Sequence, residues 1–445
     1  MAELVIRGGT LVTPEGLLTT DVAIEGGRIQ AIGPELPGGA DEIDARGLHV
    51  FPAMIDVHLH FNEPGRTEWE GAATGSRALA AGGGAVFFDM PLNSTPCTVN
   101  AREFDRKRTA LEASSITDFG LWGGIVPGNV GEMAELADRG VVGFKAFMCD
   151  SGLPEFPRAD DLTLFEGLAE SARLGLPVAV HAESHELTQG LSRKMAEQGR
   201  TSARDFLASR PVVAEVEAIE RATRLAEEAG AKLHIVHISS GRGVVAAAEA
   251  KARGVNVSIE TCAHYLFFTD EDLERLGAIA KCAPPLRDSQ QQDALWKTLL
   301  DETIDIVASD HSPAPPAMKT GAIMQAWGGI AGVQSTLAVL LEAGHFLREM
   351  QLERIAKLTA ATPARRFRIA HKGRLAPGND ADLTLVDLRG SYTLEARDLE
   401  QRHPISPYIG ATFRGVVRRT VRRGETIFAE GAITARTQGT LVRPS

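Results

Sequence analysis

The chain has 445 residues, of which 44% are hydrophobic and 24% are charged. This length allows one large domain and one smaller domain, each with a substantial core. A formal net charge of -11 argues against nucleic acid or an acidic membrane surface as a partner, because both would repel the chain. The four cysteines have no C-x-x-C spacing, and the N-terminus lacks a basic segment followed by an apolar one. We therefore expect a cytoplasmic protein.

The two ends of the chain have the patterns of a β-sheet domain. Residues 1 to about 50 contain short apolar runs that are interrupted by glycine, which is typical of strands and turns. A related pattern returns near the other end, where Val421–Gly431 resembles Val5–Gly16. Because chain termini often lie close together, we predict one β-sandwich domain built from residues 1–50 and 371–445.

The middle of the chain, residues 51–370, alternates between short apolar runs and amphipathic helical stretches. The eight predicted strands are Val50–His60, Ala85–Met90, Phe119–Ile125, Val141–Met148, Pro177–Ala182, Leu233–Ile238, Val255–Thr261 and Ile304–Ser309. The predicted helices include Glu70–Ala81, Ala101–Ala113, Leu162–Leu174, Val212–Ala229, Arg242–Arg253 and Gln290–Leu300. Such alternation implies parallel strands with right-handed crossovers, so we predict a (β/α)8 TIM barrel. A doubly wound open sheet is the alternative.

Metal-competent residues close several of the predicted strands. His58 and His60 end the first, and because side chains two apart in a strand share a face, both imidazoles can point at one metal ion. The residues that end four further strands are Lys145, His181, His237 and Asp310. Barrel active sites form at the carboxyl ends of the strands, which favours the barrel over the open sheet. Strand alternation makes His234 face away from His237, so we expect it to pack against the helices.

Lys145 lies in the apolar run Val141–Met148, where an ammonium group is costly unless it is paired or neutral. One interpretation is an ion pair with Asp310 or Asp56. The other is that the neutral amine adds CO2 and forms a carbamate, N6-carboxylysine, whose two oxygens bridge two metal ions. The second interpretation explains why a lysine stands among metal ligands.

Taken together, these residues resemble the cyclic amidohydrolase group of the amidohydrolase superfamily over essentially the whole chain. The most specific segments are His58–Gly71, Asp89–Pro96, Gly143–Met148, Glu260–Leu266, Ser309–Pro313 and Ala326–Gln334. The resemblance implies two metal sites, with ligands His58, His60 and Asp310 in one, His181 and His237 in the other, and Lys145 as N6-carboxylysine between them. It also implies two divalent ions, most often zinc with manganese, cobalt or iron as alternatives, and a homotetramer.

Within this group the sequence is most similar to the allantoinases. Dihydroorotases typically have an arginine at the position of Asn62, which cannot form the same bidentate pair with a substrate carboxylate. Hydantoinases and dihydropyrimidinases usually have a tyrosine in the loop after the bridging lysine, and Met148–Pro154 contains none. The resemblance therefore implies hydrolysis of the cyclic amide of (S)-allantoin to allantoate in purine catabolism, with Asp310 as general base.

The resemblance also indicates the surroundings of this small-molecule substrate. The substrate-binding residues that it implies are Asn62, Asn93, Cys282 and Gly328. Two other enzyme functions stay open as alternatives: that of a dihydroorotase, and that of a hydantoinase or dihydropyrimidinase. A non-catalytic scaffold is a third, although scaffolds on this fold lose metal ligands and this chain retains all six.

Overall fold

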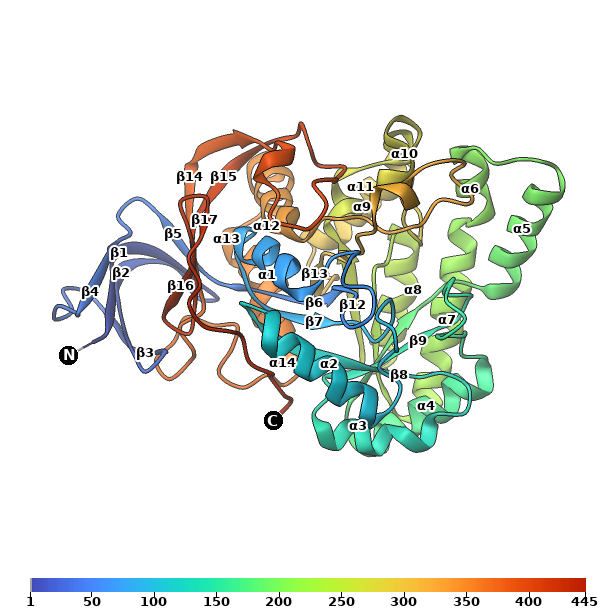
Figure 1. Ribbon diagram of the computed structural model, residues 1–445, viewed down its shortest axis with the longest axis horizontal. Coiled ribbons are helices and arrows are strands. Elements are labelled where there is room, and N and C mark those ends of the chain that lie inside the picture. The colour runs from blue at the N-terminus through green and yellow to red at the C-terminus, as the bar shows by residue number, and fades with distance from the viewer. Residues whose placement is uncertain (1) are drawn as a thin grey trace.

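Eight parallel strands in the middle of the chain form a barrel (Figure 1). The computed structural model describes residues 2–445. The barrel strands are β6 (Met54–Leu59), β7 (Gly84–Asp89), β8 (Asp118–Gly124), β9 (Gly143–Phe147), β10 (Pro177–His181), β11 (Lys232–Ile235), β12 (Val257–Cys262) and β13 (Ile306–Ala308). They pair in chain order, and a bridge between Leu59 and His311 joins the last strand to the first. The predicted barrel is confirmed.

Helices follow most of these strands and cover the outside of the barrel (Figure 1). They are α1 (Ala72–Ala81), α2 (Ala101–Ser114), α3 (Met133–Arg139), α4 (Asp161–Leu174), α5 (His185–Glu197), α6 (Ala203–Ser209), α7 (Val212–Ala229), α8 (Gly241–Ala252), α9 (Ala263–Phe267), α10 (Asp270–Leu276), α11 (Ser289–Leu300), α12 (Thr336–Val339), α13 (Leu352–Ala356) and α14 (Thr362–Arg366). Polar caps fix several starts: the side chains of Asn100 and Asp160 accept hydrogen bonds from the first turns of α2 and α4. The six predicted helices agree with these bounds to within two residues.

Both ends of the chain contribute to a second, mixed sheet. Its strands are β1 (Leu4–Thr13), β2 (Gly16–Glu25), β3 (Arg28–Gly33), β4 (Asp41–Asp44), β5 (His49–Pro52), β14 (Leu383–Thr393), β15 (Thr412–Arg422), β16 (Glu425–Ala429) and β17 (Ala432–Ile433). The central strand β5 joins the two ends, because it pairs in parallel with β1 and antiparallel with β14. Figure 1 shows the N-terminal and C-terminal strands together at one end of the molecule.

The first predicted strand, Val50–His60, is wrong as a single element. The chain divides it into β5 in the mixed sheet and β6 in the barrel. Pro52 has no N–H to donate, and beyond it the N–H of Ala53 bonds to Asp382 whereas that of Met54 bonds to Gly83 beside the barrel. The continuous apolar run therefore passes from one sheet to the other without a polar break.

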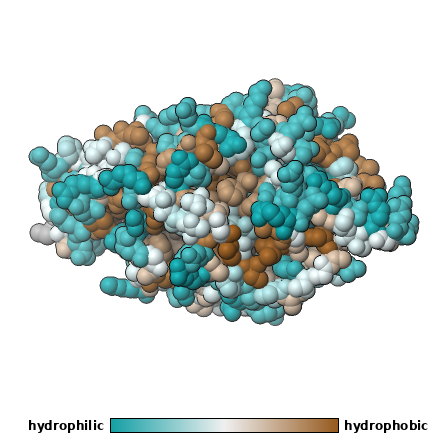
Figure 2. Space-filling view, turned by 90° about the horizontal axis from the view of Figure 1, so that it is seen from above, coloured by the Kyte–Doolittle hydropathy of each residue, from teal (hydrophilic) through white to brown (hydrophobic). Residues whose placement is uncertain are grey.

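The outer surface is mixed in character. Hydrophilic side chains cover much of the face in Figure 2, with hydrophobic patches between them. Among the described residues, no helix combines the length and the apolar character needed to cross a membrane.

Candidate metal centre

A cavity of about 450 Å³ opens at the carboxyl ends of the barrel strands. Five of the six predicted metal ligands line it: His58, His60, His181, His237 and Asp310. They come from four positions around the barrel, since β6, β10, β11 and β13 each end at this face. The fold therefore brings together residues that are up to about 250 positions apart in the sequence, as parallel barrel strands do.

Distances in this cluster are short enough for shared metal coordination. Nε2 of His58 lies 3.2 Å from Oδ1 of Asp310, and Nε2 of His60 lies 3.5 Å from the same oxygen. Ligand atoms of His58, His237 and Asp310 all lie within 4.8 Å of one another. The His237 ring is centred 4.6 Å from that of His181 and 5.3 Å from that of His58, so the second pair of histidines adjoins the first.

The charge states of these groups suit a divalent cation. Burial lowers the pKa values of His58, His181 and His237 below 6.5, which leaves their imidazoles neutral and able to donate a lone pair. Burial alone would raise the pKa of Asp310, but the neighbouring His58 and His60 lower it below 3.8. Neutral imidazoles around a carboxylate form a ligand set that zinc and related metals accept.

Lys145 lies on β9, next to this cluster but deeper in the barrel. Its side chain is fully buried, and Nζ has no hydrogen-bond partner among the described residues. The ion pair with Asp310 or Asp56 is therefore not formed. Burial lowers the pKa of Lys145 to about 8. An amine without a partner, buried beside metal-competent residues, fits a bridging position.

Two buried carboxylates hold the histidines, and both escaped prediction from the sequence. Oε1 of Glu260 on β12 accepts from Nδ1 of His58 at 2.9 Å. Oε2 of Glu183 accepts from Nε2 of His181 at 2.8 Å, which leaves Nδ1 as the ring nitrogen available to a metal. Glu183 also forms an ion pair with Arg210. The sequence signals that could have identified them are an acidic residue inside an apolar strand, for Glu260, and an acidic residue two positions after a predicted ligand, for Glu183.

The prediction that His234 packs against the helices is wrong. In the strand register, His234 pairs with Ala179, which pairs with Lys145, so all three lie in one layer facing the barrel interior. Strand β11 ends at Ile235, and His237 adopts a left-handed backbone with φ of 41°. Strand alternation does not continue through that kink, and His234 and His237 therefore both point inward.

Comparison with known proteins agrees with this geometry. The sequence profile of the Amidohydrolase family matches residues 49–427. The chain belongs to the amidohydrolase family. An allantoinase of Solibacter usitatus is 69% identical over 445 residues, covering 100% of this chain and 97% of that protein. An allantoinase of Rubrobacter xylanophilus is 56% identical, covering 99% of this chain and 98% of that protein.

Solved structures support the same assignment. The L-hydantoinase (dihydropyrimidinase) of Arthrobacter aurescens has a TM-score of 0.97 and 31% identity, with 100% of both chains covered. A D-hydantoinase has a TM-score of 0.92 and 30% identity, covering 100% of this chain and 99% of that one. The family implies a binuclear metal site, and the residues described above fit it. This amidohydrolase is therefore a hydrolase, as predicted.

The predicted substrate-binding residues lie at different depths in this amidohydrolase. Asn93, Cys282 and Gly328 line the cavity. Asn62 is buried behind it, where Nδ2 donates to the carbonyl of Pro313 at 3.3 Å and Oδ1 has no partner among the described residues. Trp327 also lines the cavity and packs edge-on against Trp69, which gives the cavity an aromatic wall that the sequence analysis did not anticipate.

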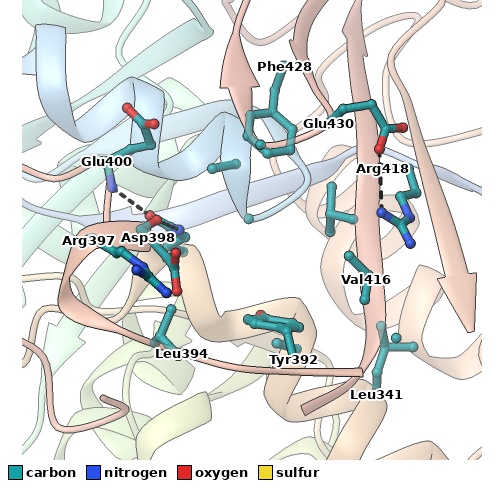
Figure 3. A pocket seen from close by; sticks show the side chains of 17 residues that line it. Leu341, Tyr392, Leu394, Arg397, Asp398, Glu400, Val416, Arg418, Phe428 and Glu430 are labelled. Atoms are coloured by element: carbon teal, nitrogen blue, oxygen red, sulfur yellow. Dashed lines mark hydrogen bonds and ion pairs between the residues drawn. The ribbon is translucent and has the colours of Figure 1, made fainter. Parts of the chain in front are cut away.

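A second cavity, of about 360 Å³, lies between α1, α12 and the strands β14 to β16 (Figure 3). None of the predicted site residues lines it. Its charged side chains have partners within the protein, as Arg418 pairs with Glu430 and Glu400 pairs with Arg77. The chemistry predicted from the sequence therefore belongs to the cavity at the end of the barrel.

Proposed function

We propose that this amidohydrolase hydrolyses the cyclic amide of (S)-allantoin to allantoate, in purine catabolism. The observation that carries the proposal is the 69% identity to an allantoinase over the whole chain. The site geometry supports it, because neutral histidines and one carboxylate converge at the floor of a cavity large enough for a small heterocycle.

The proposed metal sites use the six residues named from the sequence. His58, His60 and Asp310 would hold one ion, and His181 and His237 the other. A bound pair of divalent ions would lower the pKa of water towards 7 and polarise the amide carbonyl. Zinc is the proposed metal, with manganese, cobalt or iron as alternatives. We propose that Lys145 is N6-carboxylated by CO2, which would replace an unpartnered cation with an anionic bridge.

The remaining steps depend on the side chains. Asp310 lies 3.2 Å from His58 and 3.5 Å from His60 at the cavity floor. We infer that its carboxylate takes the proton of the attacking water and passes it to the ring nitrogen as the C–N bond breaks. Asn93 and the backbones of Cys282 and Gly328 would orient the ring by hydrogen bonds. A matched set of such partners rejects rings that leave polar groups unpaired.

The second candidate function is that of a hydantoinase or dihydropyrimidinase, because the solved relative with a TM-score of 0.97 has that title. Dihydroorotate is a weaker alternative, since Asn62 offers no cation to its carboxylate. Steady-state hydrolysis of allantoin, hydantoin, dihydrouracil and dihydroorotate, by protein grown with zinc, manganese or cobalt and assayed for metal, separates them. We expect two metals per chain and the highest kcat/KM with allantoin; a higher value for another ring would overturn the substrate assignment.

We further propose a cytoplasmic homotetramer. Exposed apolar side chains lie near the starts of three neighbouring helices, Leu162 on α4, Val213 on α7 and Val245 on α8. A large exposed apolar patch commonly marks a subunit interface, and these three side chains would contribute to one. Light scattering at several protein concentrations tests the assembly, and a monomer at all concentrations would refute it.

A further inference from the structure

Glu260 accepts hydrogen bonds from residues of both proposed metal sites. Its carboxylate is fully buried on β12. Oε1 accepts from Nδ1 of His58 at 2.9 Å and from the backbone N–H of His237 at 3.1 Å. Oε2 accepts from Nε2 of His234 at 2.9 Å. The three donors come from β6 and from the segment around β11, so one carboxylate connects β12 with strands on both sides of it.

These contacts determine which nitrogen of His58 carries the proton. A carboxylate accepts hydrogen bonds, so the 2.9 Å contact requires N–H at Nδ1. The lone pair of the neutral ring is then at Nε2, which lies 3.2 Å from Asp310. A histidine ligand commonly donates its other N–H to a carboxylate in this way, which fixes the ring and raises its basicity.

The charge of Glu260 is not neutralised within the protein. The partners within 4.0 Å are the two histidines, and no lysine or arginine of residues 2–445 forms an ion pair with it. Glu183, which holds His181, differs because Arg210 balances its charge. A buried carboxylate without a cationic partner is costly, and divalent ions held by His58 and His237 would supply the missing positive charge.

We propose that Glu260 is a positioning residue that holds His58 and His237 for the two metal ions and offsets part of the metal charge. His234 completes the arrangement, since its Nε2 donates to Glu260 and its Nδ1 lies 2.8 Å from the hydroxyl of Ser258. This inference rests on the proposed metal-dependent function.

The test is Glu260→Gln, which keeps the size of the side chain and removes its charge. The matched control is Glu215→Gln, because Glu215 is equally buried but accepts from Ser239 and Ser240 rather than from a proposed ligand. Zn²⁺ affinity is measured by competition with a chromophoric chelator, and the metal-free proteins are compared by thermal unfolding. We expect about 10- to 100-fold weaker Zn²⁺ binding for Glu260→Gln, and wild-type affinity for Glu215→Gln.

A measurement on the wild-type chain decides the case even if Glu260→Gln fails to fold. In ¹⁵N-histidine NMR spectra of the metal-free protein, the His58 signal, assigned by its loss in His58→Gln, should have the pattern of a proton on Nδ1. A proton on Nε2, or wild-type Zn²⁺ affinity in a folded Glu260→Gln, would overturn the inference while the metal site stands. A wild-type chain that binds no divalent metal would overturn the proposed function as well.

Discussion

Replacing Lys107 with methionine tests how the buried charges around the site contribute to stability. Lys107 on α2 and Asp89 at the end of β7 are both at most 1% exposed, and their charged atoms lie 2.7 Å apart. Nζ of Lys107 also donates to the carbonyl of Met90 at 2.6 Å, and Asp89 accepts from the N–H of Phe61 at 2.8 Å. The pair therefore connects the segment after His60 with the loop that carries Asn93.

The expected cost follows from burial. Lys107→Met leaves the Asp89 carboxylate buried with only the N–H of Phe61 as its donor, and breaking a buried pair in this way costs about 3–5 kcal/mol. The matched control is Arg108→Met on the same helix. Arg108 pairs with Glu112 at 3.4 Å, but the two side chains are 37% and 46% exposed, so its loss should cost less than about 1 kcal/mol.

Urea unfolding of the metal-free variants, followed by both tryptophan fluorescence and circular dichroism, gives the change in unfolding free energy. The double variant Asp89→Asn/Lys107→Met should recover much of the loss, because it removes the unpaired charge. A Lys107→Met protein as stable as Arg108→Met would refute the reasoning. So would a double variant no more stable than Lys107→Met alone.

Three further predictions concern the site and the base of the barrel. Asp310→Asn should fold normally and lose about 10²- to 10⁴-fold in kcat, measured with allantoin, because the proton acceptor is gone. Removing metal with a chelator should lower the unfolding temperature reversibly, since a ligand present at 1,000 times its Kd stabilises by about 4 kcal/mol; an unchanged temperature would contradict the metal site. At the base, Lys372 contacts Asp118 and Asp380 at 2.9 Å and Asp382 at 2.6 Å. Burial alone would raise the pKa of Asp118, but Lys372 and Arg423 lower it below 3.8, so the Asp118–Lys372 pair stabilises the fold above pH 3.8 and its contribution is lost as the pH falls. The destabilisation caused by Lys372→Met should therefore shrink below about pH 4 in urea titrations, and a constant difference down to pH 3 would contradict this.

The alternation of strands and helices made the barrel predictable, because each β/α unit is short and has its own local pattern. The convergence of the candidate metal ligands was predictable from the same strand pattern. His58, His181 and Asp310 lie at or just after the ends of apolar runs, and parallel strands bring such ends to one face; Lys145 lies within its run, one layer deeper. This convergence is predictable from the order of the strands alone, without the side-chain contacts.

What the sequence did not reveal depends on register and on backbone kinks. Alternation places His234 and His237 on opposite faces only if the strand continues between them, and β11 ends at Ile235. The left-handed backbone at His237 is not predictable from the residue type, because only a few per cent of non-glycine residues adopt it, although histidine is enriched among them. The break between β5 and β6 was missed for a similar reason, because the residues on both sides of Pro52 are apolar.

The buried acidic residues Asp56 and Glu260 show most clearly what the local sequence does not predict and the strand register decides. Burial raises the pKa of Asp56 to about 7, whereas Glu260, equally buried, has its pKa lowered to about 2, because its two histidine partners outweigh burial. Both are single acids in apolar strands, so the sequence presents them alike. Only the register brings His58 and His234 to Glu260 and leaves Asp56 with backbone N–H groups of His58 and Ser309. Which buried acid can support a metal site is therefore decided by the pairing of distant strands rather than by the local sequence.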